Sequence, residues 1–309
     1  MDFGITAGAV LVMLIYAVPG FVLVKTKAVK EEHISSFAKV LLYVCQPCLT
    51  MYQFNSVTYE KELFKNMLLF FGICTALQIV ILAAVGAVFG KRLRGDVGAR
   101  IAVCASVFGN VGYFGVPLLE KLLPGTNALA YSAMFAVSMN LMAWTLGCAL
   151  ITCDKKYVKV KKLVLNPATL VLFVALPLFF TGTKLPTEGF DLGGIVSLLA
   201  KMTAPLCMLI LGMRLATVSV KELFSNGKCY VSAAVKLVIF PLAAWAITLP
   251  LNIPELLKQV LFITCCCPTA SVVLNLSELF GEGQKQAADS VLLSTIFCLL
   301  TIPVILLIL

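Results

Sequence analysis

The chain has 309 residues, of which 61% are hydrophobic and 13% charged, and its mean hydropathy is +1.01. A soluble domain has roughly 45–50% apolar and about 25% charged residues, so this composition excludes a soluble domain and indicates a polytopic membrane protein. The net charge of +9 does not indicate a nucleic-acid partner, because the basic residues gather in alternate connections between apolar segments.

Apolar segments of about 20 residues recur along the chain, each long enough to cross a hydrocarbon core of about 30 Å as a helix. The sequence predicts ten transmembrane helices in an all-α fold, at residues 3–24, 34–54, 64–89, 98–123, 126–152, 166–182, 190–217, 229–250, 255–280 and 286–309. Asp2 stands where a secretory signal has basic residues, so the first helix is expected to be retained. The lipid bilayer is therefore the first predicted partner.

The connections after the first, third, fifth and seventh segments carry most of the basic residues, namely Lys25, Lys27, Lys30, Lys91, Arg92, Arg94, Arg100, Lys155, Lys156, Lys159, Lys161, Lys162, Arg214, Lys221 and Lys228. By the positive-inside rule these connections are cytoplasmic. This predicts a multi-pass plasma-membrane protein with both termini on the extracytoplasmic side. Nearly all of the 12 cysteines lie within apolar segments and are expected to be buried, so neither a metal nor another cofactor is predicted.

The two halves of the chain resemble each other at an offset of 158 residues. The matching pairs are Pro19 with Pro177, Pro47 with Pro205, Gln78 with Lys236, Ser106 with Thr264, and Ser132 with Ser290. Because each half holds five predicted helices, the second half enters the membrane from the opposite side and forms an inverted repeat. The predicted organisation is a first repeat over residues 1–152, a basic cytoplasmic linker over 153–165 and a second repeat over 166–309.

Helices 4 and 9 are predicted to be broken at equivalent depths. The stretch "ASVFGNVGYFGVP" over residues 105–117 places three glycines and a proline inside an apolar segment, and the offset carries Asn110 onto Pro268. Irregular backbone survives at membrane depth only where protein or a wet cavity shields it, so the two breaks are expected to cross near the midplane. Half-helices that begin there present free N–H groups and a partial positive charge, which suit an anion.

Small and neutral polar residues around the two breaks are the predicted substrate contacts: Gly109, Asn110, Gly112, Pro268, Thr269, Ser271 and Asn275. Asparagine, serine and threonine supply donors and acceptors without the cost of a buried charge. Glycine permits close backbone approach, and proline removes a backbone donor and favours a break. For the glycines alone, close packing of a neighbouring helix is an equally good interpretation.

Two lysines lie inside predicted spans. Lys201 is about ten residues into helix 7 and Lys236 about eight residues into helix 8, and ionisable residues at such depth are candidates for function. No acidic residue lies in the middle of a span, so these cations favour an anionic substrate. Gln78, the repeat counterpart of Lys236, is expected either to line the site or to pack in the core.

Three motifs resemble the auxin efflux carrier family, which includes bacterial malate permeases and the PIN auxin exporters of plants: "GNVGYFGVPLL" from Gly109, "NPATL" from Asn166 and "PLCMLILGMRLA" from Pro205. The resemblance covers essentially the whole chain and implies a fold similar to sodium/proton antiporters and bile-acid symporters. Helices 1, 2, 6 and 7 would form a scaffold and a homodimer surface. Helices 3–5 and 8–10 would form a transport domain that moves in an elevator-like step.

The same resemblance implies that Asn110 contacts substrate, although this chain has Phe108, Gly109 and Asn110 where the plant exporters have Leu-Pro-Asn. The predicted function is secondary transport of a small organic anion, such as malate or an auxin-like acid, by alternating access. The alternatives are a sodium- or proton-coupled carrier of another small solute, and a membrane sensor or scaffold that transports nothing. An enzyme is not predicted, because the single histidine, His33, lies outside the spans.

Overall fold

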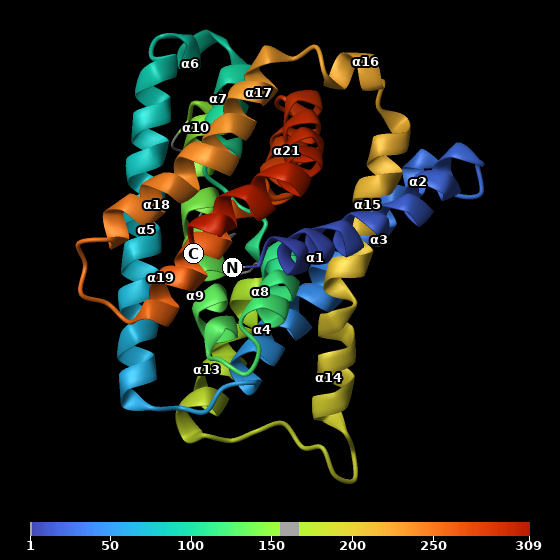
Figure 1. Ribbon diagram of the computed structural model, residues 1–309. Coiled ribbons are helices and arrows are strands. Elements are labelled where there is room, and N and C mark those ends of the chain that lie inside the picture. Colours follow the sequence, from blue (N-terminus) through green and yellow to red (C-terminus); the bar gives the residue numbers. More distant parts are fainter. Residues whose placement is uncertain (1, 155–166) are drawn as a thin grey trace.

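The computed structural model describes residues 2–154 and 167–309, and in these ranges the named elements are all helices (Figure 1). Within these ranges, seven stretches are long and apolar enough to cross a membrane. They contain α1 (Phe3–Ile15) with α2 (Ala17–Lys25); α3 (Ile34–Val40) with α4 (Gln46–Asn55); α5 (Lys61–Phe89); α9 (Ala128–Met142) with α10 (Cys148–Thr152); α14 (Leu192–Lys201) with α15 (Thr203–Thr217); α17 (Gly227–Ala234) with α18 (Phe240–Thr248); and α21 (Gln284–Ile305).

Three predicted spans differ from this set of seven. Residues 98–123 and 255–280 are interrupted, as the sequence predicted, so neither forms one continuous helix of spanning length. Residues 166–182 begin outside the described part of the chain and continue as α12 (Pro167–Leu170) and the apolar α13 (Leu172–Thr181), which is shorter than a full span. Most of the predicted linker over 153–165 also lies outside the described residues.

Four helical stretches of the described chain contain a π-helical turn, at Leu41–Cys45, Val111–Gly115, Ala143–Gly147 and Val235–Ile239. In three of them a proline, at position 47, 117 or 241, comes two residues after the turn. Proline has no N–H for the i−4 carbonyl, and its ring clashes with that carbonyl, so the preceding turn widens. The sequence thereby sets where these helices are deformed, and such turns are frequent at functional sites.

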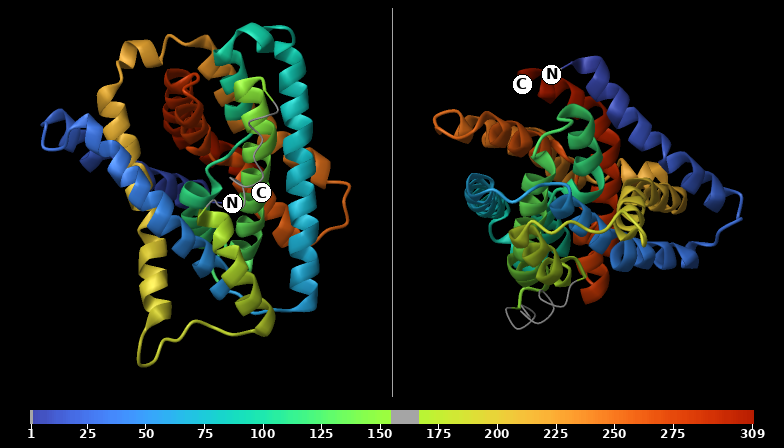
Figure 2. Two further views of the ribbon diagram at one scale, coloured as in Figure 1. Left: turned by 180° about the vertical axis from the view of Figure 1, so that it is seen from behind. Right: turned by 90° about the horizontal axis from the view of Figure 1, so that it is seen from below.

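Helices α2 and α15 are in backbone contact, and they lie side by side in the structure (Figure 1). A Cβ atom added to Gly20 would lie 1.9 Å from the carbonyl oxygen of Leu209, and one added to Gly212 would lie 1.8 Å from that of Ala17. Small residues permit this approach, which brings many dispersion contacts between two helices that have no hydrophobic driving force in lipid. The start of α1 and the end of α21 also lie together (Figure 2).

The basic connections that hold α6 (Arg92–Gly95), just before α7 (Val97–Ala105), and α16 (Val220–Leu223) lie at one end of the molecule, whereas the connection between α2 and α3 projects from its side (Figure 1). At that end Lys228 Nζ lies 2.6 Å from an Asp96 carboxylate oxygen, and Cys153 Sγ donates to Leu93 O at 3.6 Å. At the opposite end Lys184 Nζ donates to Asn55 O at 2.8 Å. The ion pair at the basic end ties the start of α7 to the start of α17.

Asp96 makes stability at that end sensitive to acid. The hydrogen bond from Lys228 lowers the pKa of the Asp96 carboxyl, and the backbone N–H of Ala99 adds to the effect. A folded-state pKa below the unfolded value of about 3.9 means that the pair stabilises the fold above that pH, and that this stabilisation is lost as pH falls through the folded pKa.

We expect Asp96→Asn to lower the free energy of unfolding at pH 7 by less than about 1 kcal/mol, because the pair is partly exposed. The thermal midpoint should therefore fall only slightly. Asparagine still caps α7, so the variant removes the charge alone. Thermal unfolding in detergent at pH 7 and pH 3 checks this. The wild type and the variant should differ less at pH 3, and an equal difference at both values would contradict the assignment.

Candidate functional site

Two broken helices cross beside each other. The first break separates α7 from α8 (Val116–Leu122), and the second separates α19 (Glu255–Cys266) from α20 (Val272–Phe280). Between them Asn110 N donates to Pro268 O at 2.7 Å and Ala270 N donates to Phe108 O at 2.8 Å. The two interruptions thus pair as short antiparallel segments, and each satisfies backbone groups that the other leaves free.

Local sequence explains why the chain leaves the helical path here. Asn110 has φ −77° and ψ 60°, and Val111 N donates to Gly109 O at 2.8 Å, which is the geometry of an inverse γ-turn. Cys267 precedes a proline and is extended. Thr269 then holds the crossing, because its Oγ1 donates to Ala105 O at 2.9 Å and its N–H donates to Ser294 Oγ at 3.0 Å.

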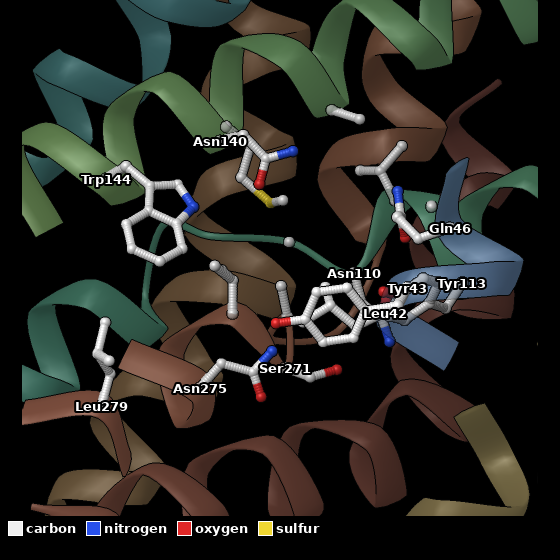
Figure 3. A pocket seen from close by; sticks show the side chains of 17 residues that line it. Leu42, Tyr43, Gln46, Asn110, Tyr113, Asn140, Trp144, Ser271, Asn275 and Leu279 are labelled. Carbon is white, nitrogen blue, oxygen red and sulfur yellow. The ribbon is translucent and has the colours of Figure 1, made fainter. Parts of the chain in front are cut away.

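A cavity of about 390 Å³ lies against this crossing (Figure 3). Its described lining residues are uncharged: Leu42, Tyr43, Gln46, Gly109, Asn110, Val111, Gly112, Tyr113, Ala136, Met139, Asn140, Trp144, Ala270, Ser271, Val272, Asn275 and Leu279. The volume falls within the range of about 300–1,000 Å³ that is usual for small-molecule sites. Both broken helices, α9 and the π-helical turn before α4 contribute to the wall.

Five of the residues predicted from sequence line this cavity, namely Gly109, Asn110, Gly112, Ser271 and Asn275. The other two predicted at the breaks, Pro268 and Thr269, lie in the crossing itself and hold its backbone. Thr269 is fully buried. The three remaining predicted residues, Lys236, Gln78 and Lys201, do not line the cavity.

Lys236 lies behind the crossing. Its side chain is fully buried, its Nζ donates to Cys265 O at 2.7 Å, and the same atom lies 4.4 Å from the centre of the Phe240 ring. A Cβ atom added to Gly109 would lie 2.9 Å from Lys236 Cε, so the lysine packs directly against the backbone of a cavity-lining residue. The amino group of Lys236 is thus paired with a carbonyl oxygen and an aromatic face next to the crossing.

Gln78 and Lys201 lie farther from this cavity. Gln78 is buried on α5, and its Nε2 donates to Ser138 Oγ of α9 at 2.9 Å, so it joins two packed helices. Lys201 is the last residue of α14 and borders a second, smaller cavity together with Gly112. The structure therefore brings together the predicted residues at the two breaks and separates them from Gln78 and Lys201.

Several lining residues were not predicted, namely Tyr43, Gln46, Tyr113, Asn140 and Trp144. Figure 3 shows Trp144, Asn140 and Asn275 across the cavity from Gln46 and Tyr113. The indole N–H of Trp144 is buried and has no hydrogen-bond partner among the described residues. Asn140 and Gln46 carried a usable signal, because uncharged polar side chains inside apolar spans tend to face a protein interior or a cavity.

Apolar spanning helices with paired breaks beside an uncharged cavity are typical of membrane transporters. Residues 5–306 match the family described as membrane transport protein, the auxin efflux carrier-like family, and the chain belongs to it. The chain is also 25% identical over 299 residues, 95% of each protein, to an uncharacterized transporter of Methanocaldococcus jannaschii. The resemblance predicted from the three motifs is confirmed.

Proposed function

We propose that this protein carries a small organic anion, a carboxylate such as malate or an auxin-like acid, across the plasma membrane by alternating access. The observation that supports this most strongly is the uncharged cavity of about 390 Å³ on which two helix N-termini converge. An anion in such a site is stabilised by backbone dipoles and neutral donors, without a fixed cation that would retain it.

Backbone groups supply part of this stabilisation. The helical stretch from Val111 to Leu122 and helix α20 both begin at the crossing. In the first of these, the N–H groups of Gly112 and Tyr113 have no backbone acceptor in the part of the chain that the structure describes. When protonated, the amine of Lys236, which packs directly behind Gly109, adds positive potential from a position where the substrate does not touch it.

Side chains supply the remaining contacts. Asn110 Nδ2 makes only a weak contact of 4.0 Å with Cys207 Sγ, which leaves its amide free to bond a substrate oxygen. The unpartnered indole N–H of Trp144 and the amide of Asn275 are further donors on the cavity wall. The rings of Tyr43, Tyr113 and Trp144 suit the apolar body of an organic acid.

The inverted-repeat organisation is part of the proposal. Two contacts support it, because Asn110 N bonds Pro268 O, and Thr203 Oγ1 lies 3.5 Å from Cys45 O. In each pair the residues are 158 positions apart, as expected where a pseudo-two-fold axis passes between repeats. In this arrangement the scaffold helices remain fixed while the domain that carries the crossing moves, and both termini are extracytoplasmic.

Uptake into proteoliposomes tests the function. Labelled malate and a labelled aryl acetate are offered to liposomes with and without imposed sodium, proton and electrical gradients, and empty liposomes serve as the control. We expect saturable uptake of at least one acid, and the gradient that drives its accumulation identifies the coupling ion. Uptake equal to that of empty liposomes under every gradient would refute carboxylate transport.

A further inference from the structure

A second cavity of about 150 Å³ adjoins the first broken helix between α4, α8 and the α14–α15 helix. We call it the outer cavity, and its wall includes Tyr52, Gly112, Pro117, Glu120, Lys201 and Ala204. Gly112 also lines the larger cavity, so the backbone of one residue separates the two spaces. The outer volume is below the range of about 300–1,000 Å³ for small-molecule sites, whereas the larger cavity falls within it.

The two cavities are stacked along the same helices. On the helix that runs from α3 to α4, Tyr43 and Gln46 line the larger cavity, and Leu49 and Tyr52 line the outer one. Steps of three along a helix keep side chains near one face, so the shift is lengthwise. On the helical stretch that ends in α8, Val111 and Tyr113 line the larger cavity, and Val116, Pro117 and Glu120 line the outer one. The outer cavity therefore lies toward the α4 and α8 ends farther from the basic connections.

The 158-residue offset relates the two walls. It carries Tyr43 onto Lys201 and Gln46 onto Ala204, and it carries Pro117 onto Asn275. Tyr43, Gln46 and Asn275 line the larger cavity, and their counterparts Lys201, Ala204 and Pro117 line the outer one. Alternating access through inverted repeats exchanges repeat counterparts between the two faces, and these three pairs fit that arrangement. Two other pairs, Gly112 with Ala270 and Tyr113 with Ser271, line the larger cavity together.

The outer cavity differs from the larger one in carrying charge. Lys201 is exposed and has neither an ion-pair nor a hydrogen-bond partner within residues 2–154 and 167–309. Glu120 is engaged, because its Oε1 accepts a hydrogen bond from Tyr52 Oη at 3.0 Å. This bond joins α8 to α4, across the narrow space. Separation of α8 from α4 would break it and would also carry the carboxylate away from the ammonium on α14.

We propose that the outer cavity is the extracytoplasmic vestibule of the transporter in a narrow form, that Lys201 binds the carboxylate of the organic anion when the vestibule widens, and that the Tyr52–Glu120 hydrogen bond holds it narrow. The inference rests on the proposed function and assigns two different residue sets to the two faces of the membrane. Lys201 contacts substrate from the extracytoplasmic face only, and the uncharged cavity receives it from the cytoplasmic face.

Transport measured separately from each face tests the assignment of Lys201. Right-side-out and inside-out membrane vesicles are compared for the wild type, Lys201→Ala and Lys201→Arg, with Lys121→Ala as a control at the same end. Loss of a charge-assisted hydrogen bond should raise the extracytoplasmic KM by about 10-fold or more, with the cytoplasmic KM within about twofold of wild type. Arginine should restore most of the affinity, and Lys121→Ala should change neither value.

Tyr52→Phe tests the hydrogen bond that holds the vestibule narrow, since it removes the hydroxyl and keeps the ring. The wide vestibule should gain population, so the extracytoplasmic KM should fall by about two- to fivefold and the cytoplasmic KM should rise. Equal changes at both faces in Lys201→Ala, or none, would overturn the assignment of Lys201. No change in Tyr52→Phe would overturn the role of the hydrogen bond. Absence of carboxylate transport in the wild type refutes the proposed function before any variant is compared.

Discussion

Replacing Asn110 with alanine should lower carboxylate flux by about 10–100-fold, which corresponds to the roughly 1–3 kcal/mol lost when a buried hydrogen-bonding partner is removed. The backbone N–H to Pro268 O bond that holds the crossing does not involve the side chain, and the inverse γ-turn at Asn110 has a negative φ that alanine also adopts. The variant should therefore keep the fold and lose the substrate contact. Initial uptake rates in proteoliposomes, normalised to reconstituted protein, measure the effect.

A control variant and a stability measurement separate loss of a substrate contact from loss of the fold. Asn252→Ala, at an exposed position in the connection after α18, is the matched control and should transport like the wild type. The thermal midpoint of Asn110→Ala in detergent should stay within a few degrees of the wild-type value. Unchanged flux would remove Asn110 from the substrate path, and a lower flux with a collapsed thermal midpoint would assign the residue to the fold.

Gly212→Ala should destabilise the protein severely. The new Cβ would lie 1.8 Å from Ala17 O and 2.7 Å from the carbonyl carbon of Ala17, so the backbones of α2 and α15 must separate. Overpacking usually costs about 1–3 kcal/mol, and here the obstacle is backbone that cannot rotate away, so we expect about 3 kcal/mol or more. The measurement is the thermal midpoint in detergent, together with the fraction that elutes as a single species.

Gly72→Ala is the matched control for this prediction. Gly72 is also in a spanning helix, but nothing lies within 4 Å of a Cβ atom added there. Alanine in an unobstructed helix position favours folding slightly over glycine. Gly72→Ala should therefore match or exceed the wild type in stability. Equal stability of Gly212→Ala and Gly72→Ala would show that α2 and α15 are not held in backbone contact.

Hydropathy predicted the apolar segments that form helices, but not the interruptions and widened turns within them. The stretch 98–123 was expected to span the membrane with a break, and glycine, asparagine and proline within it correctly placed the interruption between α7 and α8. The π-helical turns were not predicted, although a proline follows three of them. The reason is that a single widened turn does not change the apolar pattern of the sequence. It changes only which backbone groups are hydrogen-bonded.

The sequence predicted the depth of the site residues along their helices better than the direction in which their side chains point. The position of Lys236 along its helix indicated depth, but its direction depends on what packs against each face, and it points to Cys265 O behind the crossing. Asn140 and Trp144 lie on a helix whose apolar residues surround it, so periodicity could not single out the face that meets the cavity. Broken backbone is visible in sequence, whereas the neighbours of a helix face arise only from tertiary packing.

The most direct test of the central claim, that the crossing of the two broken helices binds the organic anion, is an electron cryomicroscopy map of the protein in lipid nanodiscs with its transported carboxylate. The predicted result is ligand density between Asn110, Asn275 and Trp144, with a carboxylate oxygen within hydrogen-bond distance of Asn110 Nδ2. Density confined to a site away from the crossing, with the cavity of about 390 Å³ filled only by solvent, would contradict it.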